Sequence, residues 1–144
     1  MTAFFIPGTP APQGSKTGFI RGGRVILKES SDKVKPWREA VAKAADGVLM
    51  DGPIHVEVVF VMPRTKAMGD KEAPLMTQRP DIDKLTRSTF DGLTGTAYHD
   101  DSQVVSMAVI KRRAEPDEPT GAHIKLSPAS VGLFRRLISW AFKF

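Results

Sequence analysis

The sequence contains no cysteine, which excludes a disulfide-stabilised scaffold and any zinc site built on thiolates. It also shows no apolar run of membrane-spanning length and no basic-then-apolar leader, so we expect a protein that stays in the cytoplasm and binds no membrane. The common enzyme motifs are absent as well: there is no glycine-rich phosphate loop, no Gly-x-Ser-x-Gly elbow and no zinc signature. Whatever chemistry the chain performs must therefore come from other residues.

What is present is a chain of 144 residues, 41% of them hydrophobic, with a formal net charge of +5. This length suits one domain with a substantial buried core. The basic excess favours a polyanionic partner, although many basic proteins bind nothing acidic, so the charge does not decide the function alone.

Against this basic background, carboxylates gather in two places. The stretch 79–87, RPDIDKLTR, carries Asp81 and Asp83, and Asp100 and Asp101 follow downstream. Mg²⁺ binds carboxylate oxygens and keeps several waters for a substrate phosphate. Carboxylates for a metal beside basic residues for phosphate form the charge layout of a nuclease.

The spacing of apolar and small residues predicts an amphipathic helix over residues 82–93, ending near Gly95. Its inward stripe is expected to contain Ile82, Leu85, Thr86, Thr89 and Leu93. A two-residue step turns a helix by about 200°. Asp81 must therefore lie in the non-helical lead-in after Pro80, as the N-cap or first helical residue, if its carboxylate is to converge with that of Asp83.

Two further expectations concern charge placement around this helix. Asp83 and Arg87 have the i, i+4 spacing of a pair on one helix flank. The Val- and Ile-rich run from Ser102 to Lys111 predicts a strand with Asp100 and Asp101 at its start. Because successive strand residues point to opposite faces, we expect only one of these two aspartates to reach a metal.

The block RPDIDKLTRSTFDGLTGTAYHDDSQVVSMAVIKR, residues 79–112, resembles the RusA family of Holliday junction resolvases. The family pattern runs Asp-x-Asp-Asn-Leu-x-Lys, then Leu-Asp-Ala-Leu, then Asp-Asp-x-Gln-Val. The resemblance implies a homodimeric endonuclease that uses Mg²⁺, or Mn²⁺ in its place, to cut four-way double-stranded DNA junctions symmetrically.

By the same resemblance, the metal-binding aspartates fall on Asp81, Asp83 and Asp101, with Asp100 beside them, and the catalytic lysine falls on Arg87. Two departures matter: Lys84 stands where the family usually has Asn, and Arg87 keeps the charge but does not readily deprotonate. We therefore interpret Arg87 as a clamp on the phosphate or the transition state rather than as a proton carrier.

The remaining sequence predicts a single α/β or α+β domain with a mixed sheet packed by helices. We assign residues 1–128 to the nuclease domain and residues 129–144 to an amphipathic C-terminal helix, which docks on its own domain or across a dimer. The other expected elements are strands over 2–6, 54–62 and 121–127, a hairpin over 18–28 around Gly22-Gly23, a helix from Ser30 or Ser31 to about Leu49, and an irregular stretch over 63–78.

Six basic residues are candidates for DNA contact. They lie in the proline-rich segment 10–16, in the long irregular stretch and in the acidic block: Lys16, Arg64, Lys66, Lys71, Arg79 and Lys84. The segment 10–16 could equally be a plain connecting loop, and the irregular stretch over 63–78 is either a flap over DNA or a disordered loop.

Two other readings stay open from the residues. In the first, the chain is a non-catalytic basic DNA-binding module in which Asp81 caps a helix, Asp83 pairs with Arg87 and Asp100-Asp101 forms a turn. In the second, it is a metal-dependent nuclease that acts on other branched DNA. A calcium loop is disfavoured, because the acidic residues are split by a helix and not gathered within twelve residues.

Overall fold

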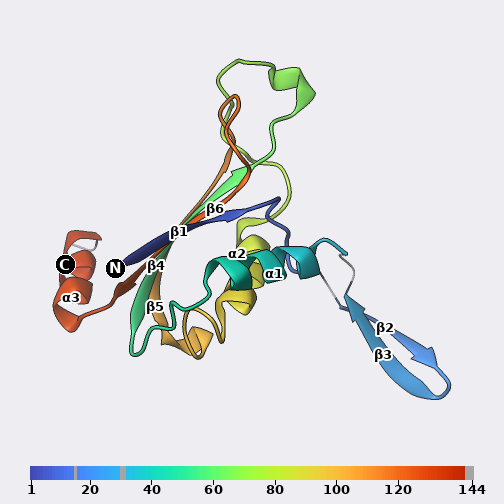
Figure 1. The fold of residues 1–144 in the computed structure, drawn as a ribbon, viewed down its shortest axis with the longest axis horizontal. Helices are drawn as coiled ribbons and strands as arrows, with labels where there is room; N and C mark the ends of the chain where they lie inside the picture. The colour runs from blue at the N-terminus through green and yellow to red at the C-terminus, as the bar shows by residue number, and fades with distance from the viewer. Residues whose placement is uncertain (15, 30–31, 142–144) are drawn as a thin grey trace.

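The structure is a computed structural model that describes residues 1–14, 16–29 and 32–141. Four strands form the main sheet in the order β1 (Thr2–Pro7), β6 (Gly121–Pro128), β4 (Ile54–Met62) and β5 (Val104–Arg113) (Figure 1). Strand β6 runs antiparallel to β1 and β4, whereas β5 runs parallel to β4. The sheet is therefore mixed and β4 is central, as the sequence predicted.

Helices α1 (Val34–Ala44) and α2 (Ile82–Leu93) pack together on the sheet, and α3 (Val131–Ala141) follows β6. Strands β2 (Lys16–Arg21) and β3 (Arg24–Glu29) form a separate two-stranded sheet that projects from the body (Figure 1). Short 3₁₀ helices, η1 (Lys66–Met68) and η2 (Asp101–Gln103), interrupt the connections. This arrangement confirms the predicted α+β class with a mixed sheet packed by helices.

Helix α2 has the inward face that its sequence predicts, with one exception. Leu85, Thr86, Thr89 and Leu93 are buried, and the hydroxyl of Thr89 accepts a 3.0 Å hydrogen bond from the indole of buried Trp37 on α1. Ile82 is 41% exposed, so its assignment to the inward stripe is wrong. It stands in the first turn between two exposed aspartates, whereas the α2 residues that contact α1 include Thr89 and Gly92, near the other end of the helix.

The predicted limits of the first helix also need correction. Helix α1 ends at Ala44 and not near Leu49, because Gly47 takes a φ of 78°, a left-handed conformation that terminates helices. The predicted start at Ser30 or Ser31 lies outside the described residues. Lys33 occupies the N-cap and makes no side-chain capping bond.

Helix α3 presents its apolar residues to solvent. The exposed side chains are Val131, Leu133, Phe134, Leu137, Ile138 and Trp140. The predicted continuation of this helix over residues 142–144 lies outside the part of the chain that the structure describes. No helix among the described residues is long and apolar enough to cross a bilayer.

Candidate active site

The first aspartate pair lies at the N-terminal end of α2. Asp81 is the N-cap, with extended backbone at φ −68° and ψ 140°, which confirms its predicted place in the non-helical lead-in. Its side chain makes no capping hydrogen bond, and its Oδ2 lies 3.6 Å from the Nζ of Lys84. Asp83 follows in the first turn and is also exposed. Two solvent-facing carboxylates therefore stand where the helix dipole is positive.

Lys111 fixes the segment that leads into this pair. From the far end of β5, its Nζ donates to the backbone carbonyls of Gln78 at 2.8 Å and Pro80 at 2.9 Å. Nearby, Arg113 donates to the carbonyl of Pro63 at 2.8 Å. The sequence reasoning missed Lys111, although the residue lies inside the block that resembles the family. The aspartate pair is thus tied to the C-terminal end of β5.

The second aspartate pair belongs to η2, which leads directly into β5 at Val104. Asp100 caps η2 by accepting from the backbone N–H of Ser102 at 2.8 Å, and the Gln103 side chain accepts in return from the N–H of Asp100 at 3.1 Å. Hydrogen bonds from Ser102 hold the pKa of Asp100 below its ordinary value. The prediction that Asp100 and Asp101 point to opposite faces of a strand is therefore wrong, because this capping box replaces extended backbone with a 3₁₀ turn.

Contacts of Tyr98 place Asp101 in space. Tyr98 is buried, packs edge-on against Phe90 with ring centroids 6.3 Å apart, and donates to the Phe90 carbonyl at 3.3 Å. Burial, and then the negative charge of Asp101, raises the pKa of Tyr98. Tyr98 also forms a β-bridge with Thr94, the C-cap of α2, and Asp101 follows Tyr98 by three residues, so Asp101 lies near the C-terminal end of α2.

The two aspartate pairs stand at opposite ends of the same helix. Twelve residues of α-helix span about 18 Å at 1.5 Å per residue, so Asp101 cannot share one ion with Asp81 and Asp83 of the same chain. In agreement, no group of three or more His, Cys, Asp or Glu side chains is placed to hold a metal within residues 1–14, 16–29 and 32–141. One subunit thus supplies two carboxylate ligands, Asp81 and Asp83, at the start of α2, and its Asp101 lies too far away to be the third.

Arg87 lies one turn after Asp83 and is exposed. Asp81 forms an ion pair with Lys84, but within the described part of the chain no ion pair joins Asp83 to Arg87. The predicted pairing is therefore not formed. An exposed pair of this kind contributes only about 0–1 kcal/mol, too little to fix two long side chains.

The predicted DNA-contact residues fall into different environments. Arg64 ties its own loop together, since its guanidinium donates to the carbonyls of Gly69, Ala114 and Lys71. These hydrogen bonds hold the segment 63–80 in place, and they leave fewer guanidinium N–H donors for a phosphate. The exposed members of the set are Lys66, Lys71, Arg79 and Lys84. Lys16 begins β2, and its side chain lies outside the described atoms.

The N-terminal loop runs along α2 beside the first aspartate pair. The backbone N–H of Gln13 donates to the carbonyl of Lys84 at 3.0 Å, and the Ser88 hydroxyl donates to the carbonyl of Ala11 at 2.5 Å. Ser88 is fully buried, so this contact is part of the core. The chain that leads into the β2–β3 hairpin is therefore anchored next to the acidic motif.

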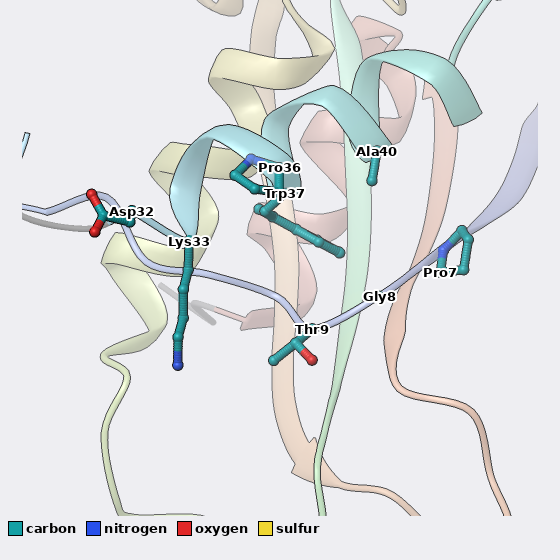
Figure 2. A pocket seen from close by; sticks show the side chains of 8 residues that line it. All are labelled: Pro7, Gly8, Thr9, Asp32, Lys33, Pro36, Trp37 and Ala40. Carbon is teal, nitrogen blue, oxygen red and sulfur yellow. The ribbon is translucent and has the colours of Figure 1, made fainter.

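A hollow of about 320 Å³ lies elsewhere, between the end of β1 and the first turns of α1 (Figure 2). It is lined by Pro7, Gly8, Thr9, Asp32, Lys33, Pro36, Trp37 and Ala40. The aromatic ring of Trp37 forms part of its wall, while its indole N–H is already bonded to α2. None of the four aspartates of the motif lines this hollow, so it is separate from the candidate site.

Comparison with known proteins gives a consistent result. A family model described as endodeoxyribonuclease RusA matches residues 7–127, which include both aspartate pairs and stop before α3. A protein of Bacillus subtilis (strain 168), named uncharacterized protein YqaN, is 30% identical over 125 residues, covering 78% of this chain and 87% of that protein. The family match takes in β4 and β5 whole, all of β6 except its last residue, and only Pro7 of β1.

Proposed function

The chain belongs to the RusA endodeoxyribonuclease family, and from this premise we propose that it is a Mg²⁺-dependent endonuclease that resolves four-way DNA junctions by symmetric hydrolysis. The observation that carries the proposal is the pair of exposed carboxylates, Asp81 and Asp83, at the N-terminal end of α2. Because Asp81 caps no backbone N–H, its oxygens remain available to a cation. Mg²⁺ sites commonly use one or two carboxylates and complete the shell with water and substrate oxygens.

The same helix end suits a phosphate. Free backbone N–H groups and the positive end of the dipole attract an anion to the first turn of α2. Lys84, Arg79 and Arg87 surround this turn with exposed positive charge. When bound, Mg²⁺ or Mn²⁺ would activate a water and stabilise the leaving oxygen. The residues of the chain hold the ion, place the phosphate beside it and offset the charge of the transition state, the role we assign to Arg87.

A third carboxylate requires a second copy of the chain. Asp101 lies about one helix length from Asp81, so a homodimer supplies it only if the two copies lie antiparallel along this direction. Strand β5 offers such a contact. It is an edge strand, and β4 is its only sheet neighbour among the described residues. Its side chains Val105, Met107 and Ile110 are 47%, 57% and 56% exposed, an apolar edge that a partner would cover.

Antiparallel pairing of two β5 strands would place the start of one beside the end of the other. Asp101 precedes the start of β5, and Lys111 holds the segment before Asp81 at its end. A two-fold axis across β5 would therefore bring Asp101 of the partner subunit toward Asp81 and Asp83. Such a dimer has two sites related by symmetry, as paired incision of a two-fold junction requires.

A subunit-mixing experiment tests this proposal. Asp81→Asn/Asp83→Asn and Asp101→Asn proteins are each expected to bind a four-way junction and fail to cut it with Mg²⁺. If sites are shared, a mixed dimer has one site with every aspartate intact. Half of the dimers in an equal mixture are mixed, so cutting should return to about a quarter of the wild-type rate, and as single nicks.

A matched variant and a measurement of metal binding help to interpret the result of the mixing experiment. Asp100→Asn should cut nearly normally, because asparagine also caps η2. Calorimetry with Mn²⁺ should show binding by the mixture and little by either variant alone, a readout independent of cutting. A mixture as inactive as its parents would reject the shared site, and a wild-type protein that cuts no junction with Mg²⁺ would reject the nuclease itself.

A further inference from the structure

The β2–β3 hairpin has a tip built for a tight reversal. Arg21 pairs with Arg24 and Ile20 with Val25 across the two strands. Between them, Gly22 and Gly23 have φ values of 59° and 75°. A two-residue hairpin turn of this kind needs positive φ at both positions, which glycine adopts at little cost. The sequence therefore specifies a tight turn, with Ile20 and Arg21 on the strand before it and Arg24 and Val25 on the strand after it.

The four side chains that flank the turn destabilise the hairpin when nothing is bound to it. Ile20 and Val25 are 78% and 71% exposed, opposite each other near the end of the ribbon. Arg21 and Arg24 are also opposite each other, and like charges placed directly across two strands destabilise them. A lone two-stranded hairpin is marginally stable in water. An anionic partner that covered the tip would remove both the charge repulsion and the apolar exposure.

The charge of the hairpin indicates the kind of partner. Residues 16–29 contain four basic side chains and one acidic one, Lys16, Arg21, Arg24, Lys28 and Glu29. Because successive residues point to opposite faces, the tip has two arginines on one face and two aliphatic side chains on the other. A folded protein surface complementary to this tip would need both acidic and apolar side chains. A nucleic-acid groove instead offers phosphates along its walls and sugar and base edges on its floor.

The base of the hairpin stands beside the proposed site. Gln13, three residues before β2, is bonded through its backbone to Lys84 in the first half of α2. From there six residues of strand reach about 20 Å at 3.3 Å per residue. The hairpin projects away from the sheet, at the opposite side of the molecule from α3 (Figure 1). DNA held at Asp81 and Asp83 would thus pass within reach of the arm.

We propose that the β2–β3 hairpin is a DNA-binding arm that enters a groove of one duplex of the substrate. Arg21 and Arg24 bind backbone phosphates, and Ile20 and Val25 cover sugar and base edges. The major groove, about 12 Å wide, admits a two-stranded ribbon. This inference rests on the proposed function for its partner, since it takes the substrate to be branched double-stranded DNA.

The charge part of the proposal is tested by comparing two double variants of equal charge. Arg21→Ala/Arg24→Ala should bind a four-way junction about tenfold more weakly, and the slope of log affinity against log salt should fall by about 2, one for each lost phosphate contact. Arg135→Ala/Arg136→Ala removes two exposed arginines from α3 and should leave the slope unchanged. Fluorescence anisotropy at several salt concentrations measures both quantities.

The apolar part predicts a different signature. Ile20→Ser/Val25→Ser should weaken binding several-fold with the salt slope unaltered, because no charge is removed. Leu75→Ser, at a side chain 91% exposed in the irregular segment, is the control and should bind as wild type. Since Ile20, Arg21, Arg24 and Val25 are all exposed, all variants should melt at the wild-type temperature, which excludes misfolding as the cause.

A direct contact can be tested because the chain has no cysteine of its own. Val25→Cys carrying a photo-crosslinker should crosslink to junction DNA, and Val131→Cys on α3 with the same group should not. If Arg21→Ala/Arg24→Ala behaves like the α3 control, or changes the mass of the dimer instead of DNA affinity, the arm proposal is overturned. The nuclease proposal then still stands if wild-type protein cuts the junction, so the two can fail separately.

Discussion

Substituting Gly92 by alanine tests how closely the two helices of the body approach each other. A Cβ at this position of α2 would lie 2.8 Å and 2.9 Å from the Cβ and Cγ1 of Val41, and 3.0 Å from the carbonyl oxygen of Arg38, both on α1. Carbon atoms prefer separations of about 3.5–4.0 Å. Because Cβ and carbonyl atoms cannot rotate away, α2 must shift from α1, and such overpacking costs about 1–3 kcal/mol.

The helix propensity of alanine opposes this cost, since alanine is favoured over glycine in a helix by about 1 kcal/mol. Gly132→Ala isolates that term, because nothing lies within 4 Å of a Cβ at Gly132 in α3. The difference between the two variants is therefore the steric cost, about 1–3 kcal/mol, or roughly 3–9 °C in melting temperature for a chain of this size. Thermal unfolding followed by circular dichroism measures it. If Gly92→Ala melts no lower than Gly132→Ala, the helices are not in the close contact described here.

Further predictions concern the candidate site and the acid stability of the fold. Arg87→Lys should retain most junction cutting, and Arg87→Ala should lose about 10²–10³-fold, the usual cost of removing one transition-state charge partner; wild-type cutting by Arg87→Ala would show that the residue is only a surface charge. DNA binding should weaken steeply with salt and depend little on base sequence, and a flat salt dependence in anisotropy would remove the role of the basic surface. Arg112 binds Glu118 through two 2.7 Å hydrogen bonds and lowers the pKa of Glu118 to about 2. The stabilisation is complete above the ordinary carboxyl pKa of 4.5 and is lost as the pH falls toward 2, so Glu118→Gln should lower the melting temperature at neutral pH and flatten its acid-side decline.

The parts of the fold that the sequence predicts are those with a regular pattern of burial. Alternation from Ile54 to Met62 identifies β4 to the residue, because every second side chain enters the core. Helical spacing of Leu85, Thr89 and Leu93 likewise identifies α2 and puts Asp81 just before it. These features are local, so they can be read from neighbouring residues alone.

The parts that the sequence does not predict depend on placement in space or on single hydrogen bonds. The sequence predicts the helix after Asp81, but not that the turn over residues 94–100 leaves Asp101 near the far end of that helix. Gln103 looks like the start of a strand, but its side chain accepts from two backbone N–H groups and donates to the carbonyls of Met50 and Gly52, which fixes η2 instead. Arg64 has the charge of a phosphate ligand in the sequence, but in the structure its guanidinium donates to the carbonyls of Ala114 and Gly69.

The pairing of β1 has a consequence for how the chain is made. Within the described part of the chain, residues 2–7 pair only with residues 121–126 of β6, which also joins β1 to β4. About 60 residues separate the end of β4 from the start of β6, which at roughly 5–20 residues per second is about 3–12 s of synthesis. Throughout that interval a nascent chain carries the apolar β4 and the N-terminal strand without the strand that connects them. The sheet of this protein is completed only after β6 has left the ribosome, and until then its exposed strands are open to chaperones and to neighbouring nascent chains.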